Sequence, residues 1–349
     1  MPKSGVDFFI HFIGLSVLFC GISGRVMYST STQKAYWTFP SPEAITELRI
    51  AANERFRAKY EHVIQPTEED VFLTPDEETT LRNIVTETGI RFAEDFRPPM
   101  WLSVRWTAFA YFKRFFLYNS TMEYSPKSVM MACFYLAAKV DEFNLSIQDF
   151  VHNLRSGTAK TNAETILSLE PEIMLKLNYH LTVHAPFRPF EGHLIEMKTR
   201  SLLGFDLEQV RPHSNDFFKK ALLGDVMLLY PPSQIAMAAL KYALHKLDKS
   251  DDLLKDQFLY KLLNIDTWQP QNDDVMLCEK LIRRLDAIIA VVLSSCEPIT
   301  KEANAALQSK MQRWVAALPE LEKRLNESTN ITQNDNSNTN SGFNSDDDD

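Results

Sequence analysis

Apolar residues recur at helical spacing through the stretch from Ser125 to Glu142. Pro126 suits the first position of a helix, where its missing N–H is no loss, and Ser125 can cap that helix. The stretch closes on charged residues, but before them it is apolar almost all round, which is typical of a buried helix. The pattern therefore predicts a buried central helix whose C-terminal end presents a recognition site.

The same pattern recurs downstream, from Pro232 onward. Pro232 repeats Pro126, and the apolar and small residues that follow it keep the phase of the first copy. Each copy follows an apolar helical segment that ends in a tyrosine, at Tyr118 and at Tyr230. This recurrence predicts a duplicated, all-helical unit of about one hundred residues, which is an ordinary size for a domain.

Periodicity and capping signals divide the chain into a series of predicted helices. An N-terminal helix is expected over 42–59, and a C-terminal one, broken near Pro319, over 299–325. The helices of the first unit are expected over 74–96, 100–118, 125–142, 147–154 and 163–177, with a kink or a late start at Pro171. Those of the second unit are expected over 190–200, 207–229, 232–247, 252–262 and 273–295.

These elements predict an all-α fold with two tandem five-helix repeats and flanking N- and C-terminal helices. The boundaries are predicted at 27–72 for an N-terminal arm and helix, 73–182 for the first repeat, 183–297 for the second, 298–326 for the C-terminal helix and 327–349 for a disordered acidic tail. Aromatic residues in the arm, Tyr36 and Trp37 among them, indicate that the arm docks onto the rest of the molecule.

Residues 1–26 form an apolar N-terminal extension. Lys3 precedes an apolar run from Phe8 to Ile22, which gives the outline of a secretory signal peptide, although the run is short for a membrane span. The interpretation we favour is an upstream extension that does not belong to the working protein, because Met27 offers a second plausible start.

The composition agrees with a helical globular protein. The 349 residues suggest roughly two domains, and glycine is scarce at 10 residues. The net charge of -9 is uneven, because Asp346–Asp349 supply four of the negative charges. The rest of the chain is only mildly acidic, which argues against a nucleic-acid-binding surface, since that would need a basic stripe.

The motifs of common catalytic and cofactor sites are missing from the sequence. It has no G-x-x-x-x-G-K-[ST] or G-x-G-x-x-G phosphate loop, no H-E-x-x-H and no G-x-S-x-G. His180 and His184 are four residues apart, but we interpret them as ordinary surface or core histidines. The cysteines form no C-x-x-C pair. We therefore predict a binding protein, not an enzyme, with no catalytic residue, no cofactor and no metal.

Six segments in order resemble the cyclin family, and within it the transcription-type cyclins. They are the arm Met27–Phe39, Tyr111–Phe115 (Tyr-Phe-Lys-Arg-Phe), Met122–Tyr124, Lys139–Asn144 (Lys-Val-Asp-Glu-Phe-Asn), Arg188–Gly192 with Lys198–Arg200, and Pro232–Ala236 (Pro-Ser-Gln-Ile-Ala). The resemblance covers roughly Met27 to Ser295. Each motif is modest alone, but six in order are specific, and they imply a fold of two cyclin boxes.

The resemblance also implies a function. Among the transcription-type cyclins, these segments imply the regulatory subunit of the cyclin-dependent-kinase-activating kinase, which contains a catalytic kinase chain and a RING-finger assembly subunit. That complex also forms part of the transcription factor TFIIH, where it phosphorylates the tail of RNA polymerase II. The implied partners are therefore the kinase, the RING-finger subunit and TFIIH, in the nucleus, with no direct nucleic-acid or membrane partner.

The resemblance implies a kinase-binding site at the end of the central helix. In cyclins, the lysine that closes this helix and a glutamate of the fifth helix grip the kinase near its αC helix, and these positions match Lys139 and Glu170. We also expect Glu142, Phe143 and Lys113 to contribute to partner binding. Without the family, Lys139 reads as a cation favoured by the helix dipole, and Glu170 as a solvated helix charge.

The sequence departs from the family pattern in two places. The arginine that cyclins of this type carry is absent at Trp101-Leu102-Ser103, and Pro171 stands beside Glu170. Two alternatives remain open: another transcription-type cyclin, of the cyclin C type, or a nucleic-acid-binding adaptor of the same fold. The second alternative would need a basic face, which the sequence does not show.

Overall fold

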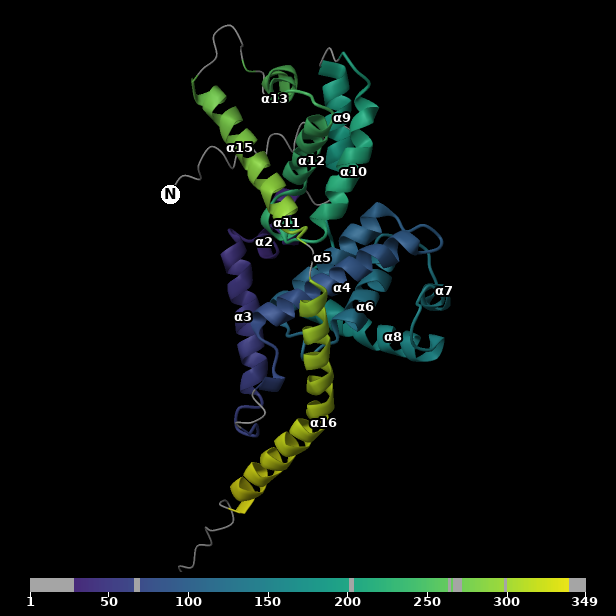
Figure 1. Ribbon diagram of the computed structural model, residues 1–349, viewed down its shortest axis with the longest axis vertical. Helices are drawn as coiled ribbons and strands as arrows, with labels where there is room; N and C mark the ends of the chain where they lie inside the picture. The colour runs from purple at the N-terminus through teal and green to yellow at the C-terminus, as the bar shows by residue number, and fades with distance from the viewer. Residues whose placement is uncertain are drawn as a thin grey trace, which may run out of the picture.

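The computed structural model describes residues 28–65, 70–200, 204–262, 265, 272–297 and 300–338. Across these residues the ordered elements are helices, and no strand occurs among them. They form two bundles that follow one another along the long axis of the molecule, with α3 and α16 beside the first bundle (Figure 1). No helix in these ranges combines the length and apolar character needed to cross a membrane.

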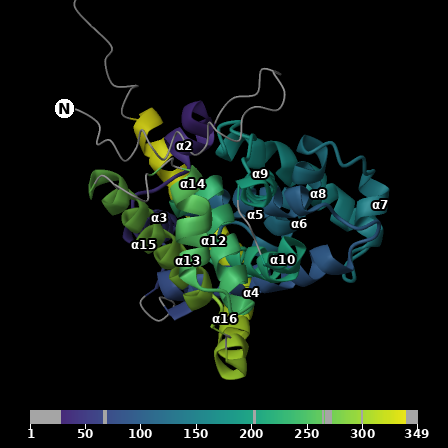
Figure 2. The same cartoon turned by 90° about the horizontal axis from the view of Figure 1, so that it is seen from above.

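The first bundle contains the five helices that the sequence predicts for the first repeat. They are α4 (Pro75–Asp95), α5 (Leu102–Tyr118), α6 (Pro126–Val140), α7 (Ile147–His152) and α8 (Ala159–Lys176). The central helix α6 packs against α5 on one side and α8 on another. Viewed from above, α7 lies at the outer edge of this bundle, far from α3 and α15 (Figure 2).

Small residues let α6 occupy the centre of this bundle. Ala132, Ala137 and Ala138 are fully buried, so neighbouring helices approach the α6 backbone closely. Phe134 fills the space beside them and meets Phe109 of α5 edge-on, with ring centroids 5.5 Å apart. The buried central helix that the sequence predicts is therefore present, and it begins at Pro126 as expected.

The second bundle repeats this plan with more interruptions. It contains α9 (Phe187–Arg200), the short helix η3 (Leu207–Gln209), α10 (Val210–Ala221), α11 (Val226–Leu229), α12 (Pro232–Lys246), α13 (Asp251–Leu254), the π-helical turn η4 (Lys255–Leu259), α14 (Tyr260–Leu262) and α15 (Asn272–Ser294). Here α12 is the central helix, packed against α9, α10 and α15.

The prediction of one continuous helix over 207–229 is wrong. The chain leaves α10 after Ala221 and turns before α11 begins at Val226. Gly224 lies in this turn, where a Cβ atom would fall 2.1 Å from the Ser295 hydroxyl oxygen. The turn can approach the end of α15 only because residue 224 has no side chain.

The N-terminal arm docks as the sequence predicts. It comprises η1 (Tyr28–Thr30) and α2 (Thr32–Tyr36), and it leads into α3 (Pro42–Ala58). The Trp37 side chain is 2% exposed. The amide of Phe39 donates a hydrogen bond of 2.7 Å to the carbonyl of Leu228, so the arm reaches from the first bundle to the second.

The C-terminal helix α16 (Lys301–Asn338) packs against α3 through a separate hydrophobic cluster. The indole of Trp314 is buried against Phe56, Tyr60 and Phe72, and its N–H donates a hydrogen bond of 3.2 Å to the Met122 carbonyl. Figure 1 shows a bend along α16, and Pro319 lies inside the helix. The proline is thus consistent with a bend in α16. The sequence predicts that the helix breaks near Pro319, but the helix continues through this residue.

The helix α16 continues to Asn338, which is beyond residue 327, where the sequence predicts that disorder begins. Extending a helix costs much less than nucleating one, so polar residues continue a helix that packing has already fixed. The apolar extension at 1–26 and the acidic residues after Asn338 lie outside the described residues.

Candidate partner-binding site

Lys139 and Glu170 come together as the resemblance implies. Lys139 lies in the last turn of α6, and its ammonium is 2.5 Å from Oε1 of Glu170 on α8. The Lys139 side chain is half exposed, whereas the Glu170 side chain is mostly buried. The pair therefore presents one accessible cation and one shielded carboxylate where α6 and α8 meet.

The end of α6 has a defined backbone geometry that fixes this charge. Glu142 has a φ of 59°, in the left-handed region, and the Phe143 amide donates a 2.8 Å hydrogen bond back to the Ala138 carbonyl. This is the Schellman arrangement, in which the left-handed residue is usually glycine. A glutamate there costs backbone energy, and its side chain is exposed.

The ring of Tyr135 supports Lys139 from one helical turn earlier. The Lys139 ammonium lies 5.5 Å from the centre of this largely buried ring. Residues four apart share one helix face, and a cation over an aromatic face is attracted by the ring. Lys139 is thus held by an aromatic ring and a carboxylate before it could meet a partner.

Exposed apolar side chains occur on the elements that carry the ion pair. Val140 follows Lys139, and Leu167 precedes Glu170 by one turn of α8, with 46% of Leu167 exposed. At the start of α5, Trp101 is 53% exposed and Leu102 is 47% exposed. Phe143 is buried beneath Trp101, with ring centroids 5.3 Å apart. Several exposed apolar side chains beside polar groups are typical of a protein–protein interaction site.

Pro171 lies inside α8, which runs through it from Ala159 to Lys176. The helix neither starts late nor ends at the proline, and Glu170 keeps its position facing Lys139. Because proline has no N–H, the carbonyl of Leu167 cannot receive the usual helical hydrogen bond from residue 171. This departure from the family pattern therefore leaves the carboxylate in place and changes the backbone next to it.

Lys113 does not belong to this site, contrary to the prediction. It is 5% exposed, and its ammonium donates a hydrogen bond of 3.3 Å to the Leu223 carbonyl of the second bundle. Burial lowers the pKa of Lys113 to about 8, partly offset by Asp225, whose carboxylate is 3.9 Å away. Lys113 therefore forms a contact between the bundles, and no local sequence pattern indicates that Asp225 is its partner.

His180 and His184 bind the arm. The indole N–H of Trp37 donates a hydrogen bond of 3.2 Å to Nδ1 of His180, and the amide of His184 donates one of 2.7 Å to Oε1 of Gln33. Burial lowers the pKa of His184. Among the described residues, no group of three or more histidines, cysteines and carboxylates is arranged to hold a metal ion.

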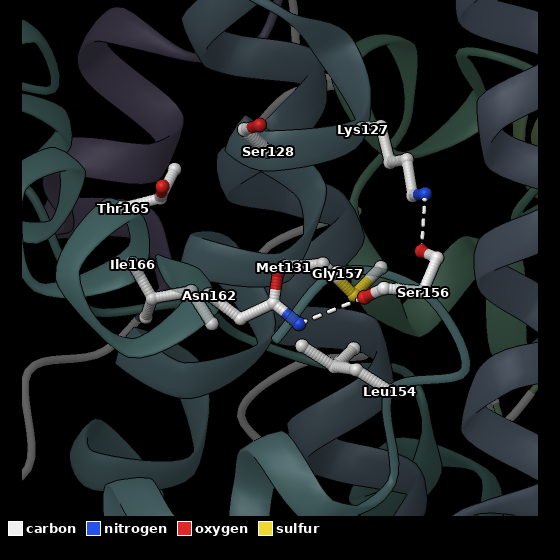
Figure 3. Close-up of a pocket in the computed structure, with 9 residues that line it drawn as sticks. All are labelled: Lys127, Ser128, Met131, Leu154, Ser156, Gly157, Asn162, Thr165 and Ile166. Carbon is white, nitrogen blue, oxygen red and sulfur yellow. Dashed lines mark hydrogen bonds between the residues drawn. The ribbon is translucent and has the colours of Figure 1, made fainter. Parts of the chain in front are cut away.

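A separate pocket of about 290 Å³ lies between the first turns of α6 and α8 (Figure 3). The Lys127 ammonium at its edge donates a hydrogen bond of 2.7 Å to the Ser156 hydroxyl, and Asn162 donates one of 2.8 Å to the Ser156 carbonyl. Its apolar lining consists of Met131, Leu154 and Ile166. The lining contains no carboxylate, histidine or cysteine, so it offers no acid–base pair for catalysis.

Comparison with known families assigns the two bundles. Residues 56–182 match the cyclin N-terminal domain, and residues 185–297 match the cyclin C-terminal domain. The chain therefore belongs to the cyclin family, which confirms the resemblance and the all-α fold of two five-helix repeats.

Within the family, the chain is similar to Cyclin-H of Xenopus laevis, with 37% identity over 292 residues, which are 82% of this chain and 86% of that protein. A chain in the structure of the CAK complex from Chaetomium thermophilum bound to ATP-gamma-S is 25% identical, with a TM-score of 0.62 over 92% of this chain and 98% of that one. A chain of the yeast TFIIK complex (Kin28/Ccl1/Tfb3) shares the fold, with 23% identity and a TM-score of 0.58 over 76% of this chain and 100% of that one.

Proposed function

We propose that this cyclin is the regulatory subunit of a cyclin-dependent-kinase-activating kinase and has no catalytic activity of its own. The Lys139–Glu170 ion pair, flanked by exposed apolar side chains, carries the proposal because it has the features of a docking site for a helix. The similarity to Cyclin-H and to a chain of a CAK complex supports the choice of kinase.

The mechanism is a shift between two states of the kinase. An active protein kinase needs its αC glutamate paired with the lysine of strand β3. A rigid groove that binds αC in its inward position stabilises the paired state and so raises its population. The apolar side chains at the site, such as Leu167 and Val140, supply affinity, as in other helix-in-groove complexes. Lys139 fixes the register of the kinase helix, because interface charges favour one alignment over others.

The further partners follow from the same assignment. We include a RING-finger assembly subunit and the transcription factor TFIIH among them, and we place the complex in the nucleus. The relevant substrates are the activation loops of cyclin-dependent kinases and the C-terminal domain of RNA polymerase II. The similarity to Cyclin-H and to a chain of a CAK complex supports the assignment from which these partners follow.

The test is reconstitution with the catalytic kinase chain of a CDK-activating complex. The full chain is mixed with that kinase, and phosphorylation of an activation-loop substrate and of a polymerase tail peptide is measured. We expect strong stimulation by the cyclin and no phosphorylation by the cyclin alone. Stimulation only of a different transcription-type kinase would instead favour a cyclin of the C type.

A matched pair of variants locates the binding site. Lys139→Glu reverses the charge at the end of α6 and places it against Glu170, so we expect kinase affinity to fall at least tenfold. Lys127→Glu makes the same charge change on an exposed lysine in the first turn of α6, and we expect affinity within twofold of wild type. Equal affinity for both variants would remove Lys139 from the site.

A further inference from the structure

Asp225 lies where three parts of the molecule meet. It belongs to the turn between α10 and α11 in the second bundle. Arg49 of α3 donates two parallel hydrogen bonds to its carboxylate, of 2.7 Å to Oδ2 and 2.8 Å to Oδ1. The ammonium of Lys113, on α5 of the first bundle, is 3.9 Å from Oδ1. The Asp225 carboxylate, which belongs to the second bundle, thus contacts both the N-terminal helix α3 and the first bundle.

The two cations are shielded from water, and the carboxylate is partly exposed. The side chains of Arg49, Lys113 and Asp225 are 13%, 6% and 27% exposed. Burial alone would raise the pKa of Asp225, but the Arg49 guanidinium, with Lys113 beyond it, holds that pKa below its usual range. Arg82 on α4 adds a third buried cation near the carboxylate, and the buried Glu78 carboxylate lies 3.6 Å from Arg82.

An aromatic contact across the same seam, which is the interface between the two bundles, is less directional. Trp106 of α5 packs edge-on against Phe187 of α9, with ring centroids 5.8 Å apart. Ring contacts of this kind tolerate small rotations, whereas a bidentate arginine–carboxylate pair has one favoured geometry.

We propose that Asp225 is the centre of an ionic lock that fixes the angle between the two bundles. Arg49 takes part in the lock by binding α3 to Asp225 of the second bundle. The aromatic contacts hold the bundles together, and the lock selects one orientation among those that the aromatic contacts permit. The turn that carries Asp225 is itself held close to the end of α15 through Gly224. The inference concerns the cyclin alone and does not depend on the proposed kinase.

The test measures the distance between the bundles in the full chain. Spin labels are attached at Glu164→Cys in α8 and Glu279→Cys in α15, in a background where Cys20 and Cys296 are replaced by serine. Pulsed electron paramagnetic resonance then gives the distance distribution between them. For the labelled chain with Asp225 in place, we expect one narrow distribution of the distance between the labels. For Asp225→Asn, we expect this distance distribution to be at least twice as broad or to have a shifted mean.

The seam provides its own control pair. Lys219 of α10 and Glu94 of α4 also join the two bundles, with their charged atoms 2.7 Å apart, but both side chains are substantially exposed. The double variant Lys219→Met with Glu94→Gln should keep the wild-type distance distribution, since exposed ion pairs contribute little. Broadening in this control as large as in Asp225→Asn would contradict a specific role for Asp225.

A second variant keeps the proposal testable if Asp225→Asn fails to fold, which far-ultraviolet circular dichroism would show. Arg49→Lys retains the positive charge but loses the bidentate fork, so we expect a folded chain with a broadened distribution. An unchanged distribution in Arg49→Lys, or in a folded Asp225→Asn chain, would overturn the lock.

Discussion

Lys139 and Glu170 form an ion pair of 2.5 Å within the cyclin itself, across the contact between α6 and α8. The cation that we propose for partner binding is therefore already oriented, and a kinase that binds there would not have to immobilise a free lysine. Preorganisation of this kind lowers the entropic cost of association. It also means that a structural and a functional role for the pair must be separated by experiment.

The exchanged variant Lys139→Glu with Glu170→Lys separates the two roles. The exchange restores an ion pair between α6 and α8, and residue 139 at one end of the pair is half exposed. We therefore expect the free energy of unfolding to stay within about 1 kcal/mol of wild type. Kinase affinity should nevertheless fall at least tenfold, because the accessible charge has changed sign. Urea unfolding and binding titrations measure the two quantities, and recovery of kinase affinity by the exchange would make the pair purely structural.

The pattern of apolar positions was sufficient to predict α6 and its repeat α12, because both helices are buried on nearly all sides and begin at a proline. The pattern was not sufficient to predict the role of Lys113. A lysine in an apolar helix suggests a solvent-exposed position until its partner is known, and the partner Asp225 lies far along the chain in the second bundle. Likewise, Gly224 marks a break only because the end of α15 lies against it, which the local sequence does not show.

Lys113 should make the free energy of unfolding of the cyclin depend on pH above pH 8. Burial lowers its pKa in the folded chain to about 8, whereas the pKa of a lysine in an unfolded chain is near 10.5. Between these values the unfolded chain binds more protons than the folded chain, so this group makes the free energy of unfolding rise with pH. The charges that face Lys113 are Asp225, Arg49 and Arg82, and Asp225 keeps Arg49 as its partner when Lys113 is neutral.

The variant Lys113→Met isolates this effect. Methionine is flexible enough to occupy the lysine's space, and it removes a buried charge. We expect the variant to be at least as stable as wild type at pH 7. Between pH 8 and pH 10, we expect the free energy of unfolding of wild type to rise by up to a few kcal/mol relative to that of the variant. Urea unfolding at unit pH intervals gives both curves, and parallel curves would show that Lys113 stays charged throughout.

The arm should detach when its buried tryptophan is removed. Trp37→Ala deletes the indole that is buried beside Tyr118 and donates to His180, so most of the docking energy of the arm is lost. Limited trypsin digestion followed by mass spectrometry should then show much faster cleavage after Lys34. Tyr36→Phe is the control, because Tyr36 is 60% exposed and phenylalanine keeps the stacking of this ring on His180, so the cleavage rate of this variant should stay close to wild type. Equal rates in both variants would mean that Trp37 does not anchor the arm.

Trp314 should account for most of the docking of α16. Its indole contacts three aromatic side chains of the cluster around α3 and donates to the Met122 carbonyl, so Trp314→Ala should cost about 3–5 kcal/mol in the free energy of unfolding. The neighbouring Val315 is 61% exposed, and Val315→Ala should change that free energy by less than about 0.5 kcal/mol. Truncation after Asn326 removes only the polar continuation of α16 and should have an equally small effect. Urea unfolding of the three variants measures these differences. A loss on truncation as large as that of Trp314→Ala would show that the end of the helix, and not the tryptophan, holds α16 in place.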